Sequence, residues 1–265
     1  MVELNGQLKV LIERHPDGVS LIALNRPSVH HAIDSELIEA LAIQLDALAQ
    51  DASLRVLVLT STSTDAFCSG ADLRERRQMT PEQRAAHTGS IEAVANGLAA
   101  FPAPTIAAVN GFALAGGAEI ALACDIRVAA STVILGFPEV RIGIFPGAGG
   151  VLRLPTLIGS GAARDLLFTG RRVKADEAFR MGLIDHLVPG NDAIPAAREM
   201  ASTIATNAPL AVRALKSALR ASSSQADSRA AEIIARYRKR LDDTEDYAEG
   251  LAAFAEQRSP RFVGR

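Results

Sequence analysis

The first half of the sequence alternates short, almost unbroken apolar runs with segments of helical periodicity. Runs at 55–60, 105–109 and 125–130 consist mainly of Val, Ile, Leu and Ala. Such runs are typical of strands that are buried on both faces. Repeated strand–helix–strand units require right-handed crossovers, which place the strands in parallel. The sequence therefore predicts an α/β fold built on a parallel sheet.

The spacing of apolar residues predicts the helices. Asp34 is a candidate N-cap for a helix that follows a strand at 19–24, and further helices are expected at 81–100 and 116–124. After Gly150 the pattern becomes helical, at 193–206, 209–221 and 228–257. We therefore expect an α/β core over residues 1–195 and a helical C-terminal region over 196–265, which packs on its own core or on a neighbouring subunit.

Composition and charge exclude several classes of function. The 265 residues carry 28 basic and 30 acidic side chains, nine Phe, two Tyr and no Trp, so neither a basic face nor a stacking platform for nucleic acid is expected. Asn110 and Glu119 interrupt the most apolar stretch, 104–124, which argues against a membrane span. Two widely spaced cysteines and an N-terminus without signal-peptide features lead us to expect a soluble, cytoplasmic protein.

Several common catalytic motifs are missing from the sequence. The five histidines show no metal-ligand spacing, so no metal site is expected. There is no GK[ST] phosphate loop and no GxSxG nucleophile elbow. The Gly159–Gly161 segment resembles a dinucleotide loop, but Arg164 occupies the position of its third glycine.

Two segments rich in small residues each follow a predicted strand. They span residues 66–74 and 110–119. Parallel strands bring their carboxyl ends to one edge of the sheet, where small residues let a ligand approach the backbone. One backbone N–H from each segment could then converge on a single oxygen as an oxyanion hole. Tight turns that need positive φ explain the same glycines equally well.

Two glutamates lie near these segments. Glu119 follows Gly116 in the first turn of a short predicted helix, and Glu139 follows Pro138 in a mostly apolar run. An acidic residue at a helix start is often structural, because it complements the helix dipole. Two carboxylates beside a glycine-lined cleft could instead divide the work of a general acid and a general base.

The motifs together resemble the crotonase superfamily, the enoyl-CoA hydratase/isomerase family, over nearly the whole chain. The matching segments are 24–27, 67–74, 107–111, 124–126, 138–139, 144–150 and 254–262. The resemblance implies a crotonase-like core of repeated β-β-α units that form a spiral, with a helical C-terminal region involved in trimer contacts and in covering the active site. It also implies a homotrimer or a dimer of trimers.

The resemblance also assigns roles to individual residues. It implies that the N–H groups of Ala71 and Gly116 hold a thioester oxygen, and that Glu119 and Glu139 are the catalytic pair of a hydratase acting on trans-2-enoyl-CoA. No cofactor is implied, because coenzyme A is part of the substrate. The remaining residues expected to bind substrate or coenzyme A are Arg26, Ser69, Asp72, Leu73, Arg74, Pro138 and Phe254.

Other functions stay open at this stage. They are double-bond isomerisation, a specialised hydratase for branched or aromatic-pathway substrates, and a non-catalytic acyl-CoA-binding protein. RNA binding has precedent in the superfamily, but the charge balance argues against it. The chain also departs from the family pattern at four positions: Gln257 replaces a common lysine, Phe137 a glutamine, and His31 and Asp34 two asparagines.

Overall fold

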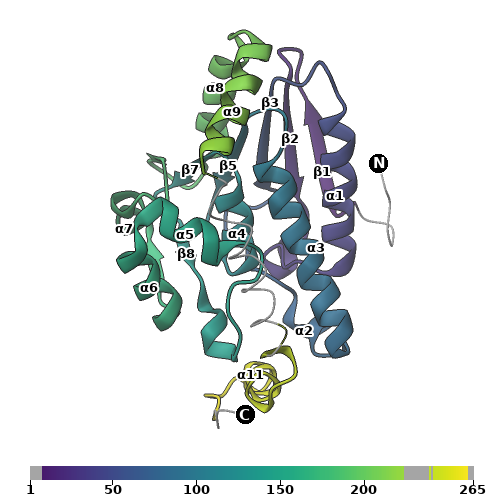
Figure 1. Cartoon of the computed structure of the whole chain (residues 1–265), viewed down its shortest axis with the longest axis vertical. Helices are drawn as coiled ribbons and strands as arrows, with labels where there is room; N and C mark the ends of the chain where they lie inside the picture. The colour runs from purple at the N-terminus through teal and green to yellow at the C-terminus, as the bar shows by residue number, and fades with distance from the viewer. Residues whose placement is uncertain (1–7, 224–238, 240, 262–265) are drawn as a thin grey trace.

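A computed structural model describes residues 8–223, 239 and 241–261, and its strands form two sheets (Figure 1). The six-stranded sheet has the order β1-β2-β3-β5-β7-β10 and the four-stranded sheet the order β4-β6-β8-β9. The strands are β1 (Val10–Arg14), β2 (Val19–Leu24), β3 (Val56–Ser61), β4 (Ala66–Cys68), β5 (Thr105–Val109), β6 (Phe112–Leu114), β7 (Ile126–Ala130), β8 (Ile134–Gly136), β9 (Arg172–Lys174) and β10 (His186–Val188).

Most strand pairs are parallel, as the sequence predicts. β2, β3, β5, β7 and β10 pair in parallel, whereas β1 is antiparallel to β2 at one edge. In the second sheet β4, β6 and β8 are parallel, and β9 runs antiparallel to β8. The pairs β3–β4, β5–β6 and β7–β8 each send one strand to each sheet, so the chain repeats a β-β-α unit.

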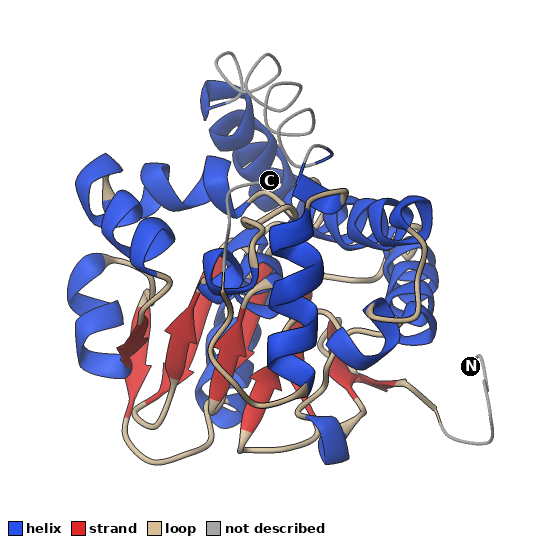
Figure 2. Ribbon diagram, turned by 90° about the horizontal axis from the view of Figure 1, so that it is seen from below, coloured by secondary structure: helices blue, strands red, loops and turns tan. Residues whose placement is uncertain are grey.

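Helices surround these sheets (Figure 2). The α-helices are α1 (Ser35–Ala49), α2 (Leu73–Arg76), α3 (Pro81–Ala99), α4 (Gly116–Ala123), α5 (Gly150–Ile158), α6 (Ser160–Thr169), α7 (Ala175–Met181), α8 (Ile194–Ala205), α9 (Pro209–Ser223) and α11 (Glu245–Ala255), and the 3-10 helices are η1 (Pro27–Val29) and η2 (Pro138–Ile142). The predicted N-cap is confirmed, because the Asp34 side chain accepts a hydrogen bond from the Leu37 N–H at 2.8 Å. The part of the predicted 228–257 helix before residue 239, and residue 240, lie outside the described residues.

The central strands β2, β3, β5 and β7 of the six-stranded sheet are buried on both faces, and each alternates between two cores. On β3, Leu57 and Leu59 belong to the large core shared with α1, α3 and α4, whereas Val56 and Val58 belong to a second core. That second core includes Ala197 and other side chains of α8. Burial on both faces explains why these strands are apolar without a polar alternation.

The C-terminal helices pack on the α/β core at separate places. α8 contacts β2, β3 and β5, so the predicted boundary between residues 195 and 196 falls inside a helix that covers the sheet. α11 contacts η2 at the opposite end of the molecule (Figure 1). Among the described helices, none combines the length and the apolar character that crossing a bilayer needs.

The elements differ from the expectations in one helix and three strands. The single helix expected over 228–257 is interrupted at residues 243–244, and α11 starts anew after its N-cap Thr244. The sequence after Gly150 was expected to be entirely helical, but β9 and β10 lie there. The antiparallel strand β1 was not expected either. All three strands lie at sheet edges, where half of the pairing groups stay open and the residues are less uniformly apolar.

Candidate active site

The two glycine-rich segments meet at the ends of β4 and β6. Gly70 has φ +94°, and a Cβ added there would lie 2.8 Å from the Cβ of Ala115 and 3.4 Å from the nitrogen of Gly116. A Cβ on Gly117 would lie 2.6 Å from the Cβ of Cys68 and closer still to its carbonyl oxygen. Only glycines allow the two backbones to approach this closely.

This approach brings together two backbone N–H groups that lack partners. The Ile33 N–H donates to the Gly70 carbonyl, and the Ile33 carbonyl accepts from the Asp72 N–H, both at 2.8 Å. These two hydrogen bonds flank Ala71 and do not use its N–H. Gly116 is the first residue of α4, where an N–H has no partner within the helix. In the described part of the chain neither N–H makes a hydrogen bond. Both are therefore available to a ligand oxygen.

The residue before Gly116 holds an uncommon backbone conformation. Ala115 is the N-cap of α4 and has φ +50° and ψ −128°. A residue with a side chain in this region carries strain of about 1–3 kcal/mol. The neighbours restrain it, since the Ala115 N–H donates to the Gly136 carbonyl at 2.9 Å. The start of α4 is thus fixed in place beside Gly70.

Glu119 projects from the first turn of α4 and is buried. Its Oε1 accepts hydrogen bonds from the N–H groups of Ala148 and Gly150, both at 2.8 Å. Two backbone donors on one oxygen stabilise the ionised carboxylate and fix its orientation. A structural role for Glu119 at the start of its own helix is compatible with the sequence, but the partners of its Oε1 lie in the loop before α5 and at the first residue of α5.

Glu139 lies in η2 and is also buried. Its Oε2 is enclosed and has no hydrogen-bond partner among the described residues. Burial first, and the nearby Glu119 carboxylate second, raise the pKa of Glu139 well above its usual value. The pair therefore combines a carboxyl group that accepts two backbone hydrogen bonds with a carboxyl group whose raised pKa favours the protonated form.

Both glutamates line one cavity of about 670 Å³, together with Ala71 and Gly116. The other predicted site residues that line this cavity are Ser69, Asp72, Leu73, Arg74, Pro138 and Phe254. The half-exposed Phe254 comes from α11, so the C-terminal helix supplies part of the wall. The structure thus brings together every predicted site residue except Arg26.

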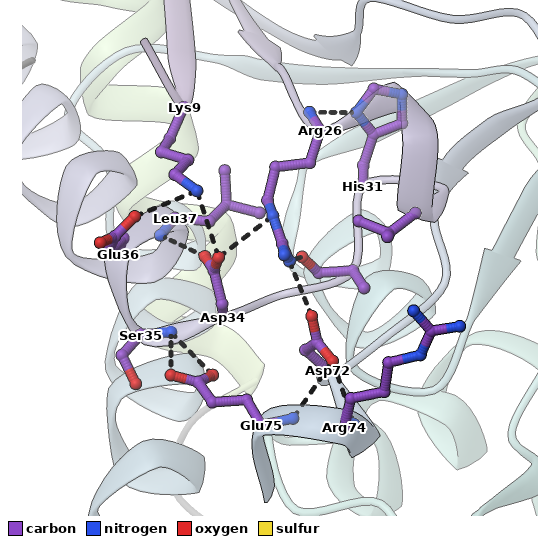
Figure 3. Close-up of polar contacts among 12 residues, drawn as sticks. Lys9, Arg26, His31, Asp34, Ser35, Glu36, Leu37, Asp72, Arg74 and Glu75 are labelled. Atoms are coloured by element: carbon purple, nitrogen blue, oxygen red, sulfur yellow. Dashed lines mark hydrogen bonds and ion pairs between the residues drawn. The ribbon is translucent and has the colours of Figure 1, made fainter. Parts of the chain in front are cut away.

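Arg26 instead ties together the loops behind the cavity (Figure 3). Its Nε pairs with Asp34 and its Nη1 with Asp72, both at 3.1 Å, and Nη1 also donates to the Ala32 carbonyl. Asp34 and Asp72 are the N-caps of α1 and α2. Arg26 is absent from the described cavity lining, and its position makes it a support for the Ala71 segment.

His31 is another buried support of this region. It has φ +53°, and its Nδ1 accepts a hydrogen bond from the Arg26 N–H at 3.0 Å. Burial, together with the charges of His30 and Arg26, lowers its pKa from 6.5 to about 4. His31 is therefore neutral in the folded protein at neutral pH and does not line the cavity in the described structure.

Replacing His31 with asparagine should make the protein less sensitive to acid. The unfolded chain takes up a proton on His31 below pH 6.5 and the folded chain only near pH 4, so stability falls as the pH falls through this window. This proton costs the wild type at most about 3 kcal/mol at the acid end. Asparagine tolerates positive φ and can accept the same hydrogen bond without titrating.

Urea denaturation at pH 7.5, 6 and 5 measures this effect. The loss of unfolding free energy between pH 7.5 and 5 should be smaller in His31→Asn than in the wild type. His186→Asn changes an exposed histidine and should leave the pH dependence as it is. Equal acid sensitivity of His31→Asn and wild type would show that His31 titrates normally.

Two further departures from the family pattern, Phe137 and Gln257, also have defined places. Phe137 is fully buried and is not part of the described cavity lining, so its ring does not replace a polar group there. Gln257 follows α11 with φ +54°. Arg258 pairs with Glu249 and Glu256 and holds the pKa of Glu249 near 2. Arg258 is thus already engaged within its own segment.

Sequence reasoning missed several cavity residues. The N–H groups of Ala148 and Gly150 were quoted only as part of a motif, and the buried Arg76 was not considered at all. In the sequence, the charged stretch from Arg74 to Arg77 has the composition of a solvent-exposed surface. Only the fold shows that Arg76 is the one buried residue among these four. No cluster of three or more potential metal ligands occurs among the described residues, and Cys68 and Cys124 are buried free thiols.

Two converging N–H donors beside a buried carboxylate pair define a site that can stabilise an oxyanion and move protons. Such a site suits enzymes that form an enolate-like charge on an acyl substrate. The family model for enoyl-CoA hydratase/isomerase matches residues 14–265. The chain belongs to this family.

Named relatives agree with that assignment. The chain is 42% identical to the human enoyl-CoA hydratase domain-containing protein 2, mitochondrial, with 98% of this chain and 91% of the relative covered. It is 38% identical to the enoyl-CoA isomerase/hydratase fer4 of Mycosarcoma maydis, with 94% and 93% covered. An enoyl-CoA hydratase structure from Bacillus anthracis superposes with a TM-score of 0.80 at 38% identity, covering 97% of this chain and 100% of that one.

The comparisons support acyl-CoA chemistry and the crotonase fold. They include proteins named for hydration and for isomerisation, so the family alone leaves both reactions open. The human relative is named as a mitochondrial protein, and a cytoplasmic location for this chain is therefore not supported.

Proposed function

We propose that the protein hydrates a trans-2-enoyl-CoA to a 3-hydroxyacyl-CoA. The observation that carries this proposal is the presence of two buried carboxyl groups, Glu119 and Glu139, in one cavity with the open N–H groups of Ala71 and Gly116. Hydration needs one group to take a proton from water and another to protonate the α-carbon. Isomerisation moves one proton between two carbons, for which a single carboxylate suffices.

The mechanism begins with the thioester carbonyl. Its oxygen accepts hydrogen bonds from Ala71 and Gly116, which draws electrons from the double bond and makes the β-carbon electrophilic. Glu119 removes a proton from water as the oxygen adds to the β-carbon. The enolate-like charge on the thioester oxygen is stabilised by the two N–H donors, each worth roughly 10²–10³ in rate. Glu139 then donates its proton to the α-carbon.

The rest of the cavity supplies the binding surface for coenzyme A. Ser69, Asp72, Leu73 and Pro138 line the cavity, and the exposed Arg74 can pair with a phosphate of the nucleotide. Phe254 of α11 would cover the acyl-CoA from the C-terminal side. In this proposal coenzyme A enters as part of the substrate, and the reaction needs neither metal nor redox cofactor.

Self-association into a homotrimer or a pair of trimers forms part of the proposal. Leu210, Leu215 and Leu219 are exposed on α9 in the described structure, so this helix presents apolar side chains there. Burial of such side chains against a second copy would be favourable.

The test of the function is a hydration assay with crotonyl-CoA. Loss of the conjugated enoyl absorbance with formation of 3-hydroxybutyryl-CoA is the expected result. A shift of the double bond without uptake of water would favour isomerisation. Tight binding of crotonyl-CoA, and of longer and branched enoyl-CoAs, without turnover would instead identify an acyl-CoA-binding protein.

A further inference from the structure

A buried cation lines the active-site cavity and takes no part in the proposed chemistry. Arg76, the last residue of α2, is only 3% exposed, and it belongs to the cavity wall. Charged side chains are rarely buried this completely unless they are paired. Among the described residues, no carboxylate forms an ion pair with Arg76.

The hydrogen bonds of Arg76 go to two neutral hydroxyl groups. Its Nε donates to the Tyr247 Oη at 3.0 Å, and its Nη1 donates to the Thr88 Oγ1 at 2.9 Å. A guanidinium has five N–H donors. Within the described structure Nη2 makes no hydrogen bond, and it is not fully enclosed by protein atoms. Arg76 lines the cavity, so its guanidinium retains a donor that is free to meet a ligand.

Tyr247 and Thr88 fix the guanidinium from two sides. Tyr247 belongs to α11 and is fully buried, and the Thr88 hydroxyl donates in turn to the Arg84 carbonyl at 2.9 Å. The Arg84 guanidinium lies 5.2 Å from the centre of the Tyr247 ring, so a second cation is close by. A preoriented cationic donor therefore stands in the cavity wall, which also contains the buried carboxyl group of Asp242.

The position of Arg76 relative to the oxyanion donors follows from α3. The Ile91 side chain reaches Gly116, since a Cβ built there would lie 3.5 Å from Ile91 Cγ2. Thr88 lies three residues earlier on the same helix, a rise of about 4.5 Å. An acyl group that leaves the oxyanion donors and passes Ile91 would thus meet the Arg76 end of the cavity after a short distance.

We propose that Arg76 binds an anionic group at the far end of the acyl chain, so that the preferred substrate is a short 2-enoyl-CoA with a terminal carboxylate. This inference rests on the proposed hydratase function. A carboxylate can pair with a guanidinium through charge-assisted hydrogen bonds, whereas a hydrocarbon terminus leaves the open Nη2 without a partner. Addition of water to the double bond leaves the terminal carboxylate unchanged.

Two substrates of similar size and the same branching test this proposal. Trans-glutaconyl-CoA ends in a carboxylate, and trans-5-methyl-2-hexenoyl-CoA carries two methyl groups in place of its two carboxylate oxygens. The wild type should hydrate glutaconyl-CoA with a kcat/KM about 10–100-fold higher, which is the range for hydrogen bonds between charged groups. Equal efficiency, or preference for the methyl compound, would overturn the proposal.

Variants of Arg76 distinguish recognition of the substrate carboxylate from structural support of α11. Arg76→Gln should lose most of the preference for glutaconyl-CoA, and Arg76→Lys should keep part of it. Because the two substrates are compared within one variant, a loss of folded protein cancels in the ratio. Arg77→Gln alters the exposed neighbouring arginine and should keep the wild-type ratio. If Arg76→Gln keeps the wild-type ratio of the two kcat/KM values, Arg76 only supports α11 and does not bind the substrate carboxylate.

A binding measurement keeps this inference separate from the hydratase proposal. The saturated analogues glutaryl-CoA and 5-methylhexanoyl-CoA can be titrated by calorimetry without turnover. Tighter binding of glutaryl-CoA to the wild type but not to Arg76→Gln supports the anion site, even if no enoyl-CoA is hydrated. Hydration of both enoyl-CoAs with equal binding of the analogues would contradict the anion site alone.

Discussion

Replacing Glu139 with glutamine should lower kcat for enoyl-CoA hydration by about 10²–10⁴-fold, the usual contribution of a positioned acid or base. The amide has nearly the same shape but cannot give a proton to the α-carbon. Glu119→Gln should produce a loss of similar size, because its amide cannot take a proton from water. Steady-state kinetics with crotonyl-CoA or the preferred enoyl-CoA measure both effects.

Stability measurements distinguish this loss from misfolding. The pKa of Glu139 is raised in the folded chain, whereas the unfolded chain releases this proton above about pH 4.5. Glu139 therefore lowers the free energy of unfolding as the pH rises above 4.5 toward the raised pKa. Glu139→Gln should therefore be more stable than the wild type at pH 7.5 while it is less active. Glu199→Gln, on the exposed side of α8, should change neither property. Full activity in Glu139→Gln would end its assignment as the acid.

The pH profile should report the same group. Hydration needs Glu139 protonated and Glu119 ionised, so kcat/KM should fall on the alkaline side as Glu139 loses its proton. The two carboxyl groups interact, and the profile therefore reports apparent values for the pair. Glu139→Gln should lose this alkaline limb in its residual activity.

Gly117→Ala should lower kcat by about 10²–10³-fold, comparable with the loss of one oxyanion donor. The new Cβ would lie 2.6 Å from the Cβ of Cys68, so the first turn of α4 must move away from β4. That movement separates the Gly116 N–H from the Ala71 N–H. The thioester oxygen then loses one of its two hydrogen bonds, because both N–H groups must point at it. It should also destabilise the fold by about 1–3 kcal/mol, as overpacking of a core does.

Gly89→Ala is the matched control for this variant. Gly89 lies within α3, where an added Cβ meets nothing within 4 Å. Alanine should stabilise the helix by about 0.5–1 kcal/mol and leave kcat unchanged. Measurement of kcat and of the free energy of unfolding in urea for both variants tests whether the close contact at Gly117 positions the oxyanion donors. Retained kcat in Gly117→Ala would mean that the contact between the two segments does not position the donors.

The sequence predicts the central strands well and the short ones poorly. β3 and β5 are recognisable because both of their faces meet a core, which leaves no polar residue to interrupt the apolar run. β4, β6 and β8 have three residues each, too few to show an alternation of period two. Only the resemblance to a known family predicted a second strand in each repeat, namely β4, β6 and β8, because periodicity alone does not reveal them.

The candidate site shows a similar division. The glycines support both interpretations that the sequence offered, because Gly70 and Gly111 do have positive φ, and the N–H groups of Ala71 and Gly116 make no hydrogen bond in the described structure. The hydrogen bonds that Glu119 accepts from Ala148 and Gly150, and the ion pairs that draw Arg26 away from the cavity, join positions far apart in the chain. No local pattern encodes such contacts, since they depend on how the two sheets bring their loops together.

The cavity is built from distant parts of the chain, because Ser28 and Phe254 both line it together with Glu119. During synthesis the strands of both sheets leave the ribosome before α11 does. The binding site is therefore completed late, after most of the core residues are available to pack. Until α11 is added, the cavity lacks the wall that Phe254 supplies, and Arg76 lacks the Tyr247 hydroxyl that holds its guanidinium.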